Sequence, residues 1–231
     1  MQSLKPLIAA MTALGIAGCA TDYAHKDAAI GAGIGAVLGA VAGKQVSRAD
    51  GAPIVGAVIG AIAGGSVGGY MDKQREDLKA KLAEEARRKE LAITQLSSDT
   101  IKIGVASDAS FDVGSATLSP TAQATFAKIA ATLKDYDKTV IHVVGHTDTL
   151  GSTENNQTLS DRRAQAVGDY LASQGVVAGR VREEGRGERE LLVRTADNVN
   201  EPRNRRVDIV IKAVVEGNEQ AAWTPPPYLG G

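Results

Sequence analysis

Beyond about residue 91, apolar residues follow strand-like and helix-like spacings in turn. Five runs have the composition or alternation of strands, and they are 91–96, 101–105, 139–144, 180–185 and 205–214. Two helices are expected between them, at 119–136, where Ser119 and Pro120 form the start, and at 154–174. This alternation predicts an α+β domain over 91–215, built as a two-layer sandwich of one sheet and its helices.

Glycine and alanine dominate residues 28–71, and the glycines recur every four residues. The two sets are Gly31, Gly35, Gly39 and Gly43, and then Gly56, Gly60, Gly64 and Gly68. A spacing of four places each set on one helical face, where another helix can approach closely. The charged stretch 44–50 separates the halves, so a helical hairpin is predicted. The repeat resembles the glycine-zipper two-helix segments of bacterial envelope proteins.

Each half of this hairpin has about the 20 residues needed to cross a bilayer, but glycine and alanine are only weakly apolar. A hairpin that inserts into or lies on the outer membrane and a packed pair in water therefore both remain open. The letters "GAGIGA" at 31–36 also match a dinucleotide-binding pattern. The polar stretch before them is not strand-like, and the glycine spacing continues past them, so nucleotide binding is rejected.

Residues 72–90 are rich in helix formers and in opposite charges spaced three and four apart, which predicts a solvated helix. At about 1.5 Å per residue, this helix would extend roughly 28 Å as a spacer.

The tail at 216–231 contains "TPPPYLGG" and has no core-forming periodicity. We expect the tail to be disordered.

An apolar run with one lysine before it and small residues after it occupies 1–18, which predicts an export signal peptide. Cys19 follows and is the only cysteine, so it has no disulfide partner within the chain. "IAGC" resembles the bacterial lipobox, which implies that Cys19 carries lipid such as palmitate and that 19–27 is a lipidated linker. Ala20 stands where an inner-membrane retention aspartate would be expected. We therefore expect an outer-membrane anchor with the carboxy-terminal domain in the periplasm.

The composition argues against several other functions. A formal net charge of −1 does not suit a nucleic-acid-binding protein, which needs a basic surface. The chain has no G-x-S-x-G or H-E-x-x-H pattern, so we expect no enzyme activity. His142 and His146 would lie about 13 Å apart on an extended strand, too far to share a metal ion. We expect His146 to be a structural loop residue, and we predict no metal and no cofactor.

The helix at 154–174 carries a charge within its apolar face. At roughly 100° per residue, Arg163 falls in the middle of the apolar cluster. The members of that cluster are Leu159, Ala166, Val167, Tyr170 and Leu171. An unpaired buried charge is severely unfavourable. Arg163 therefore either forms an internal ion pair or points into a pocket that takes a ligand carboxylate.

The loop "GHTDTLG" at 145–151 follows the strand 139–144, and loops at strand ends beside helix N-termini commonly form binding sites. Asp148 supplies a carboxylate in this loop. Together, Asp148 and Arg163 could hold a zwitterion, with the aspartate taking an ammonium group and the arginine a carboxylate. The same two side chains could instead pair with each other when the site is empty. Asn156 and the loop amides could add neutral hydrogen bonds.

These motifs together resemble the OmpA-like peptidoglycan-binding domain of outer-membrane proteins and peptidoglycan-associated lipoproteins. The resemblance covers about residues 91–213. The matching stretches are "FDVGSATL" from Phe111, "GHTDTLG" from Gly145, "NQTLSDRRA" from Asn156 and "NRRV" from Asn204. The resemblance implies that Asp148 and Arg163 grip diaminopimelate, a zwitterion at the free end of the peptidoglycan stem peptide.

The resemblance also implies supporting roles for Thr147, Asn156 and Arg205. In the family, the turn after the phenylalanine often contributes a polar residue, whereas here it is Val113 and Gly114. Any contact at that turn, including one at Gly114, therefore falls to backbone groups.

Two functions of different class follow from the sequence. In the first, the protein is a binding module that tethers the outer membrane to the cell wall. In the alternative, the glycine-rich hairpin inserts into the membrane or forms homo-oligomers, and wall binding only positions it.

Overall fold

The computed structural model describes residues 59–230. The predicted signal peptide, Cys19, the linker and most of the glycine-rich hairpin lie outside the described residues. The helices are η1 (Gly64–Ser66), α2 (Val67–Lys81), α3 (Ala83–Arg87), η2 (Ser107–Ala109), α4 (Pro120–Asp135), α5 (Thr153–Ser173), η3 (Ala178–Arg180) and α6 (Glu219–Trp223). The strands are β1 (Leu91–Ser97), β2 (Thr100–Ala106), β3 (Thr139–His146), β4 (Val181–Gly185) and β5 (Arg206–Ala213).

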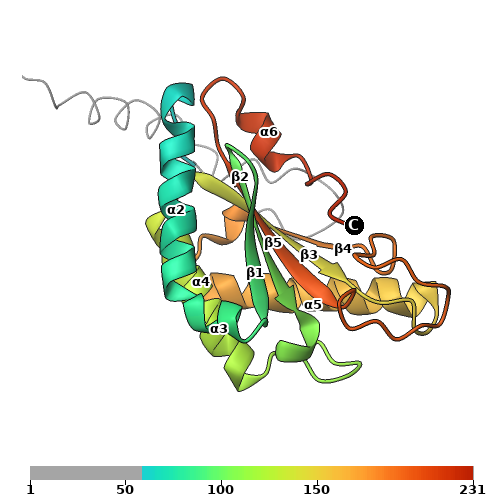
Figure 1. Cartoon of the computed structure of the whole chain (residues 1–231). Coiled ribbons are helices and arrows are strands. Elements are labelled where there is room, and N and C mark those ends of the chain that lie inside the picture. The colour runs from blue at the N-terminus through green and yellow to red at the C-terminus, as the bar shows by residue number, and fades with distance from the viewer. Residues whose placement is uncertain (1–58, 231) are drawn as a thin grey trace, which may run out of the picture.

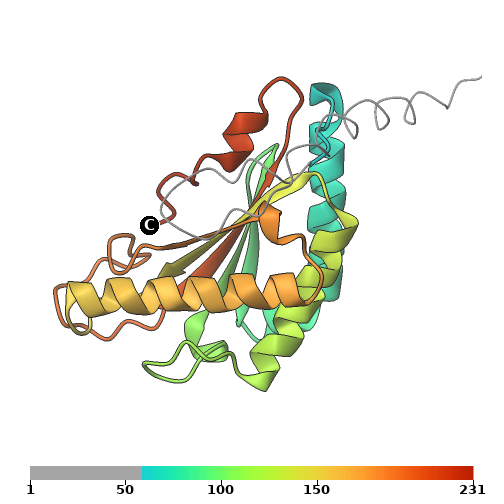
Figure 2. The same cartoon turned by 180° about the vertical axis from the view of Figure 1, so that it is seen from behind.

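The five strands form one sheet in the order β1-β2-β5-β3-β4. All neighbouring strands are antiparallel except β3 and β4, which are parallel. The helices α4 and α5 cover one face of the sheet (Figures 1 and 2). Val207, Ile209 and Ile211 alternate along β5 and are fully buried in the main core on this face. The predicted α+β sandwich is confirmed, and each predicted strand and helix of the domain is present.

Helix α5 packs very close to the sheet because small residues meet across the contact. A Cβ atom on Gly145 would collide with the backbone oxygen of Ser160, and one on Gly185 would collide with the Ser160 side chain. The buried face of α5 is therefore centred on small residues together with Arg163. Leu159, which the helical projection placed within the apolar face, is only half-buried.

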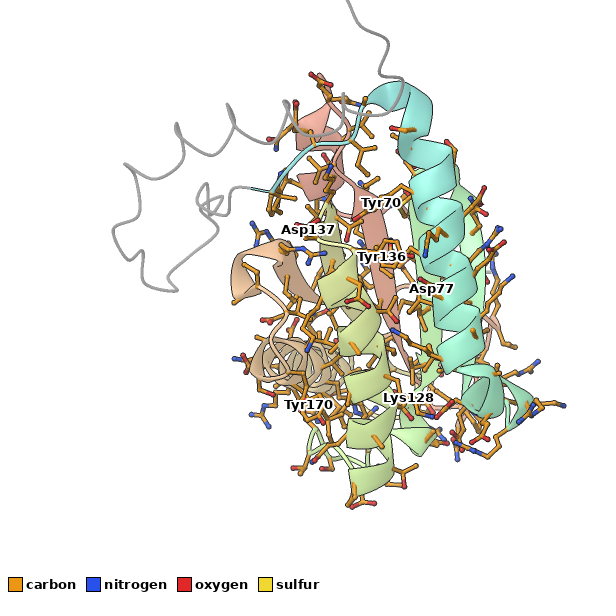
Figure 3. The ribbon with its side chains drawn as sticks, turned by 90° about the vertical axis from the view of Figure 1, so that its left-hand side faces the viewer. Tyr70, Asp77, Lys128, Tyr136, Asp137 and Tyr170 are labelled. Atoms are coloured by element: carbon orange, nitrogen blue, oxygen red, sulfur yellow. The ribbon has the colours of Figure 1, made fainter. Side chains whose placement is uncertain are left out.

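Residues 72–90 do not form the solvated spacer that their charge pattern predicts. α2 runs beside α4 at the side of the sheet (Figures 1 and 3). Met71, Leu78 and Leu82 are fully buried and belong to the main core. The apolar residues of this segment are few, but they recur on one face, and that face is covered.

Polar contacts also hold α2 and α3 against α4, and Figure 3 labels Tyr70, Asp77 and Tyr136, which make those of α2. The rings of Tyr70 and Tyr136 meet edge to face, with their centroids 5.2 Å apart. The Tyr136 hydroxyl donates to Asp77 Oδ2 at 2.5 Å. Glu85 is buried, and its Oε1 accepts a hydrogen bond from Lys128 Nζ at 2.6 Å. These contacts join segments that are far apart in the chain, so the local charge pattern does not reveal them.

Near the end of the glycine-rich segment, Ile62 joins the sheet before the chain enters η1 and α2. Ile62 forms a parallel bridge with Val215, and its backbone nitrogen donates to Val214 O at 2.8 Å. Gly64 lies in η1 and Gly68 in α2, so these glycines do not share one helical face. The prediction of a helical hairpin up to residue 71 is therefore wrong for 59–63, while 64–71 are helical. Packed structure begins well before the expected domain boundary at 91.

The prediction of a disordered tail is wrong for residues 216–230. This segment contains α6 and lies over the sheet face that α4 and α5 leave open (Figure 1). Leu229 is buried with Val144 and Val210 of the sheet. Arg186 donates to the backbone oxygen of Pro226 at 2.8 Å, which holds the proline-rich part in place. Among the described residues, no helix combines the length and apolar character needed to cross a membrane.

Candidate functional site

The candidate site lies where β3 ends and α5 begins. β3 runs to His146, so Thr147 and Asp148 come directly after the strand, and both are buried. Ser152 caps α5, and its side chain accepts a hydrogen bond from Asn155 N at 3.2 Å. This short connection brings the Asp148 carboxylate close to the start of α5, where the sequence predicts a site.

Arg163 reaches the site from α5 and is only 2% exposed. Its Nε donates to the backbone oxygen of Ser115 at 2.9 Å, and its guanidinium carbon lies 5.1 Å from the centre of the Phe111 ring. Within the described residues, Nη1 of Arg163 is buried without a hydrogen-bond partner. Burial lowers the pKa of Arg163, and the negative charges of Asp108 and Asp148 oppose this shift. The guanidinium therefore lies within the field of both carboxylates.

Asp148 is paired with Arg205. Nη1 of Arg205 donates to Asp148 Oδ2 at 2.6 Å and also contacts Asn200 Oδ1. Nε and Nη2 of Arg205 donate to the two carboxylate oxygens of Asp108 at 3.0 and 2.6 Å. The pKa of Arg205 is raised, mainly by its hydrogen bonds to Asp108 and further by Asp148. Asp148 Oδ2 also accepts a hydrogen bond from the backbone nitrogen of Glu201 at 3.2 Å.

The sequence left open whether Asp148 and Arg163 pair with each other, and in the structure they do not. The ion pair of Asp148 forms with Arg205, and no ion pair joins Asp148 to Arg163 among the described residues. Sequence reasoning missed Asp108, which holds the other side of Arg205. It also assigned no role to Ser115, although this residue lies within the quoted stretch "FDVGSATL".

The other predicted site residues are Asn156, Thr147 and Gly114, and none of them carries a charge. Nδ2 of Asn156 donates to the backbone oxygen of Asp148 at 3.2 Å and to Glu188 Oε2 at 2.6 Å, so it braces the loop. Thr147 Oγ1 is buried without a hydrogen-bond partner among the described residues. Gly114 has a φ of 71° in an exposed turn, and the next residue, Ser115, supplies the oxygen that holds Arg163.

His146 is the last residue of β3 and not a loop residue, which corrects the prediction. It is fully buried, and its Nε2 lies 3.3 Å from Asp208 Oδ2. Arg206 Nε donates to the same oxygen at 3.0 Å. His142 faces a different partner and donates from Nε2 to Ala222 O at 2.8 Å. No group of three or more His, Cys, Asp or Glu side chains suited to a metal ion occurs in residues 59–230.

Comparison with known proteins agrees with the motifs and the fold. Residues 110–205 match the OmpA family, and residues 1–72 match the YMGG-like Gly-zipper. The probable lipoprotein YiaD of Escherichia coli K12 is 37% identical over 142 residues, which are 62% of this chain and 63% of that protein. Outer membrane protein A of Shimwellia blattae is 36% identical over 119 residues, or 47% of this chain and 49% of that protein. The chain thus spans less than two thirds of the length of these relatives.

Solved structures share the architecture. The cell wall anchor of the T6SS from Pseudomonas aeruginosa aligns with a TM-score of 0.53 at 30% identity, over 60% of this chain and 99% of that one. A putative MotB-like protein from Desulfovibrio vulgaris aligns with a TM-score of 0.56 at 20% identity, over 64% and 97%, and therefore shares the fold. Fold and motifs define a protein with an OmpA-like domain. In this chain that domain follows a YMGG-like glycine-zipper segment, and the resemblance recognised in the sequence is confirmed.

Proposed function

We propose that this protein binds peptidoglycan at the site of Asp148 and Arg163 and so anchors the outer membrane to the cell wall. One observation carries the proposal: Arg163 is 2% exposed, and its Nη1 has no hydrogen-bond partner in the described part of the chain. A buried cation in this state is unfavourable until an acceptor arrives. A ligand carboxylate would supply that acceptor, and the planar guanidinium suits it.

The ligand that fits best is a zwitterion, and we infer that it is the free end of diaminopimelate in the stem peptide. Its carboxylate would meet Arg163, and its ammonium group would meet Asp148. Arg205 already holds Asp148 Oδ2 at 2.6 Å, so the ammonium group would have to share that carboxylate with Arg205. Neither Asp148 nor Arg163 is a nucleophile with an activating base, so the inferred role is binding and not catalysis.

The position of the site within the sheet supports a tether. Ile62 joins the sheet beside Val214 and Val215, near the Thr139 end of β3, where Thr139 pairs with Ala213. Asp148 follows the opposite end of the same strand. Eight residues of strand, at about 3.3 Å each, separate the two ends by roughly 25 Å. The chain therefore enters at one pole of the domain, and the proposed wall site lies near the other.

The proposal of a membrane anchor is based on the sequence and on the relatives. We propose that lipid on Cys19 anchors the chain in the outer membrane and that the OmpA-like domain lies in the periplasm. The relatives named lipoprotein and outer membrane protein support this location. Substituting Cys19→Ser should release the protein from the membrane fraction. Retention of this variant in the membrane would instead assign the anchor to another segment.

The wall site is tested by co-sedimentation of the full chain with purified diaminopimelate-type peptidoglycan. Asp148→Asn and Arg163→Met should each reduce the retained fraction at least tenfold, because each leaves one ligand charge without its partner. Arg162→Met is the matched control. Arg162 is the neighbouring arginine and is exposed, so this substitution removes the same charge outside the site. Wall material with lysine in place of diaminopimelate lacks the zwitterionic end and should retain little protein. Full retention of both site variants would overturn the assignment.

A further inference from the structure

A groove of about 710 Å³ lies on the face of the sheet turned away from α4 and α5, beside the part of this face that the carboxy-terminal segment covers. Its floor comes from β1, β2 and β5, and its walls come from the end of α3 and from the loop between β4 and β5. The proposed wall site uses none of these lining residues except Arg205. We call this feature the outer-face groove.

The floor of the outer-face groove is made deep by small side chains. Ala92 on β1 pairs directly with Gly104 on β2, and Ala106 is a further small residue of the lining. A Cβ on Gly104 would lie 3.1 Å from Asp208 Oδ1, so the glycine leaves the space above this carboxylate free of side chain. One wall presents Leu192, an apolar side chain that is 39% exposed.

Charge gives the outer-face groove its chemical preference. Its lining contains five basic residues, Lys89, Lys102, Arg203, Arg205 and Arg206, but only two acidic ones, Glu90 and Asp208. The three arginines are already engaged by carboxylates, namely those of Glu201, Asp108, Asp148 and Asp208. Within residues 59–230, the side chains of Lys89 and Lys102 form no ion pair. Both lysines therefore lack an ion-pair partner, although Lys102 lies within the electrostatic field of Asp208.

A second observation at the floor points to a ligand. Asp208 is 1% exposed, and its Oδ2 is shared between Arg206 and His146. Its Oδ1 is buried without a hydrogen-bond partner among the described residues. A buried acceptor left unpaired costs free energy, and a donor such as a peptide N–H would satisfy it.

We propose that the outer-face groove binds an extended acidic peptide segment of a partner protein. Carboxylates of the segment pair with Lys89 and Lys102, an apolar side chain packs on Leu192, and a backbone N–H approaches Asp208 over Gly104. The volume of the groove lies within the range of ligand-binding pockets. The combination of apolar wall, small floor and free lysines matches a peptide with alternating acidic and apolar residues.

The test is fluorescence anisotropy of the full chain with a labelled probe peptide, acetyl-Ala-Glu-Leu-Glu-Ala-Glu-amide. We expect saturable binding of this probe and at least tenfold weaker binding of the same peptide with glutamine in place of glutamate. The double variant Lys89→Gln with Lys102→Gln should weaken probe binding about tenfold, since each exposed ion pair contributes a few-fold. Gly104→Leu, which fills the floor, should weaken it at least as much.

Two controls separate this groove from general charge attraction and from the wall site. Lys79→Gln with Lys134→Gln removes the same charge from exposed positions on α2 and α4 and should leave probe binding unchanged. Arg163→Met should also leave it unchanged, so failure of the wall site does not affect this test. Equal binding of the two peptides, or equal weakening by the control lysines, would overturn the proposal. Displacement of the probe from the Arg163→Met variant by purified muropeptides would also overturn it, by identifying the groove as a second wall site.

Discussion

Arg205 donates to Asp148 across 2.6 Å, whereas Arg163, the arginine expected to face Asp148, donates only to a backbone oxygen. The aspartate of the site thus has an ion-pair partner in Arg205, whereas the buried arginine has none among the described residues. The site consequently has a stronger requirement for an anion than for a cation. In the proposed complex, the carboxylate of the ligand contributes the larger share of the binding free energy.

Arg163→Met should separate stability from function. Methionine fills a similar volume without a charge, and because Arg163 forms no ion pair among the described residues, its removal leaves no buried carboxylate without its partner. We expect the free energy of unfolding to stay the same or rise by about 1 kcal/mol, while peptidoglycan retention is lost. Denaturant unfolding and co-sedimentation measure the two quantities. A loss of stability above about 2 kcal/mol would show that Arg163 serves the fold.

Gly145→Ala should be strongly destabilising because α5 lies against this position. Its Cβ would collide with the backbone oxygen of Ser160, and a backbone atom cannot swing away as a flexible side chain can. We expect a loss of about 3 kcal/mol in the free energy of unfolding. Gly69→Ala is the matched control, because it lies in α2 with nothing within 4 Å of the new Cβ. Helix propensity should make that variant more stable by about 0.5 kcal/mol.

Leu229→Ala tests whether the ordered tail contributes to stability. Leu229 is 5% exposed and is buried with Val144 and Val210. Its truncation should lower the free energy of unfolding by about 2 kcal/mol, at the low end for buried leucine because the cluster is small. Tyr228→Ala, at a side chain that is 57% exposed, should change it by less than about 0.5 kcal/mol. Equal effects of the two substitutions in thermal or denaturant unfolding would contradict the packed tail.

The fold should lose stability between pH 6.5 and pH 4 in part through His142. Burial lowers the pKa of His142 to about 4, against its hydrogen bond to Ala222 O, which acts in the opposite direction. In the unfolded chain the same group titrates near its ordinary value of about 6.5. Between these two values the unfolded state binds more protons than the folded state, so acidification favours unfolding. The stabilisation is complete above about pH 6.5 and disappears as the pH falls toward 4.

The size of this effect follows from the shift. From pH 7 to pH 5, His142 should account for a loss of about 2 kcal/mol in the free energy of unfolding. His142→Gln retains a donor for Ala222 O and removes the titration. The pH 7 to pH 5 difference in this variant, measured by denaturant unfolding, should therefore be smaller by that amount. His146 also has a pKa lowered by burial, but it contributes equally to both proteins. An unchanged pH dependence in this variant would show that His142 does not contribute to the loss of stability at low pH.

Features that depend on local pattern could be predicted closely. The strand at Thr139–His146 follows from its β-branched run, and α4 begins where Ser119 precedes Pro120 and caps the helix through Ala122 N. The proximity of Asp148 and the start of α5 follows from a short loop between two elements. Such features could be predicted because alternation, caps and turns involve residues within a few positions of one another.

Features that depend on distant contacts were missed or misread. The partner of Asp148 is Arg205, which lies 57 positions away, and the chain offers several other arginines at no obvious disadvantage. α2 has the charge pattern of an exposed helix, yet Leu78 is fully buried in the main core. The tail has no periodicity, because Leu229 and its neighbours fit the surface of the sheet and not a repeat of their own.

By itself, the sequence determined the succession of strands and helices along the OmpA-like domain, the loop that carries Asp148 and the presence of a cation on the buried side of α5. Only the tertiary structure decided which carboxylate neutralises which arginine, that α2 and the tail cover the domain, and that Arg163 keeps a hydrogen-bonding nitrogen without a partner. The physical reason is the separation along the chain over which each kind of interaction acts. Periodicity and capping act between near neighbours, whereas charge pairing and burial depend on which distant segments the folded chain brings into contact.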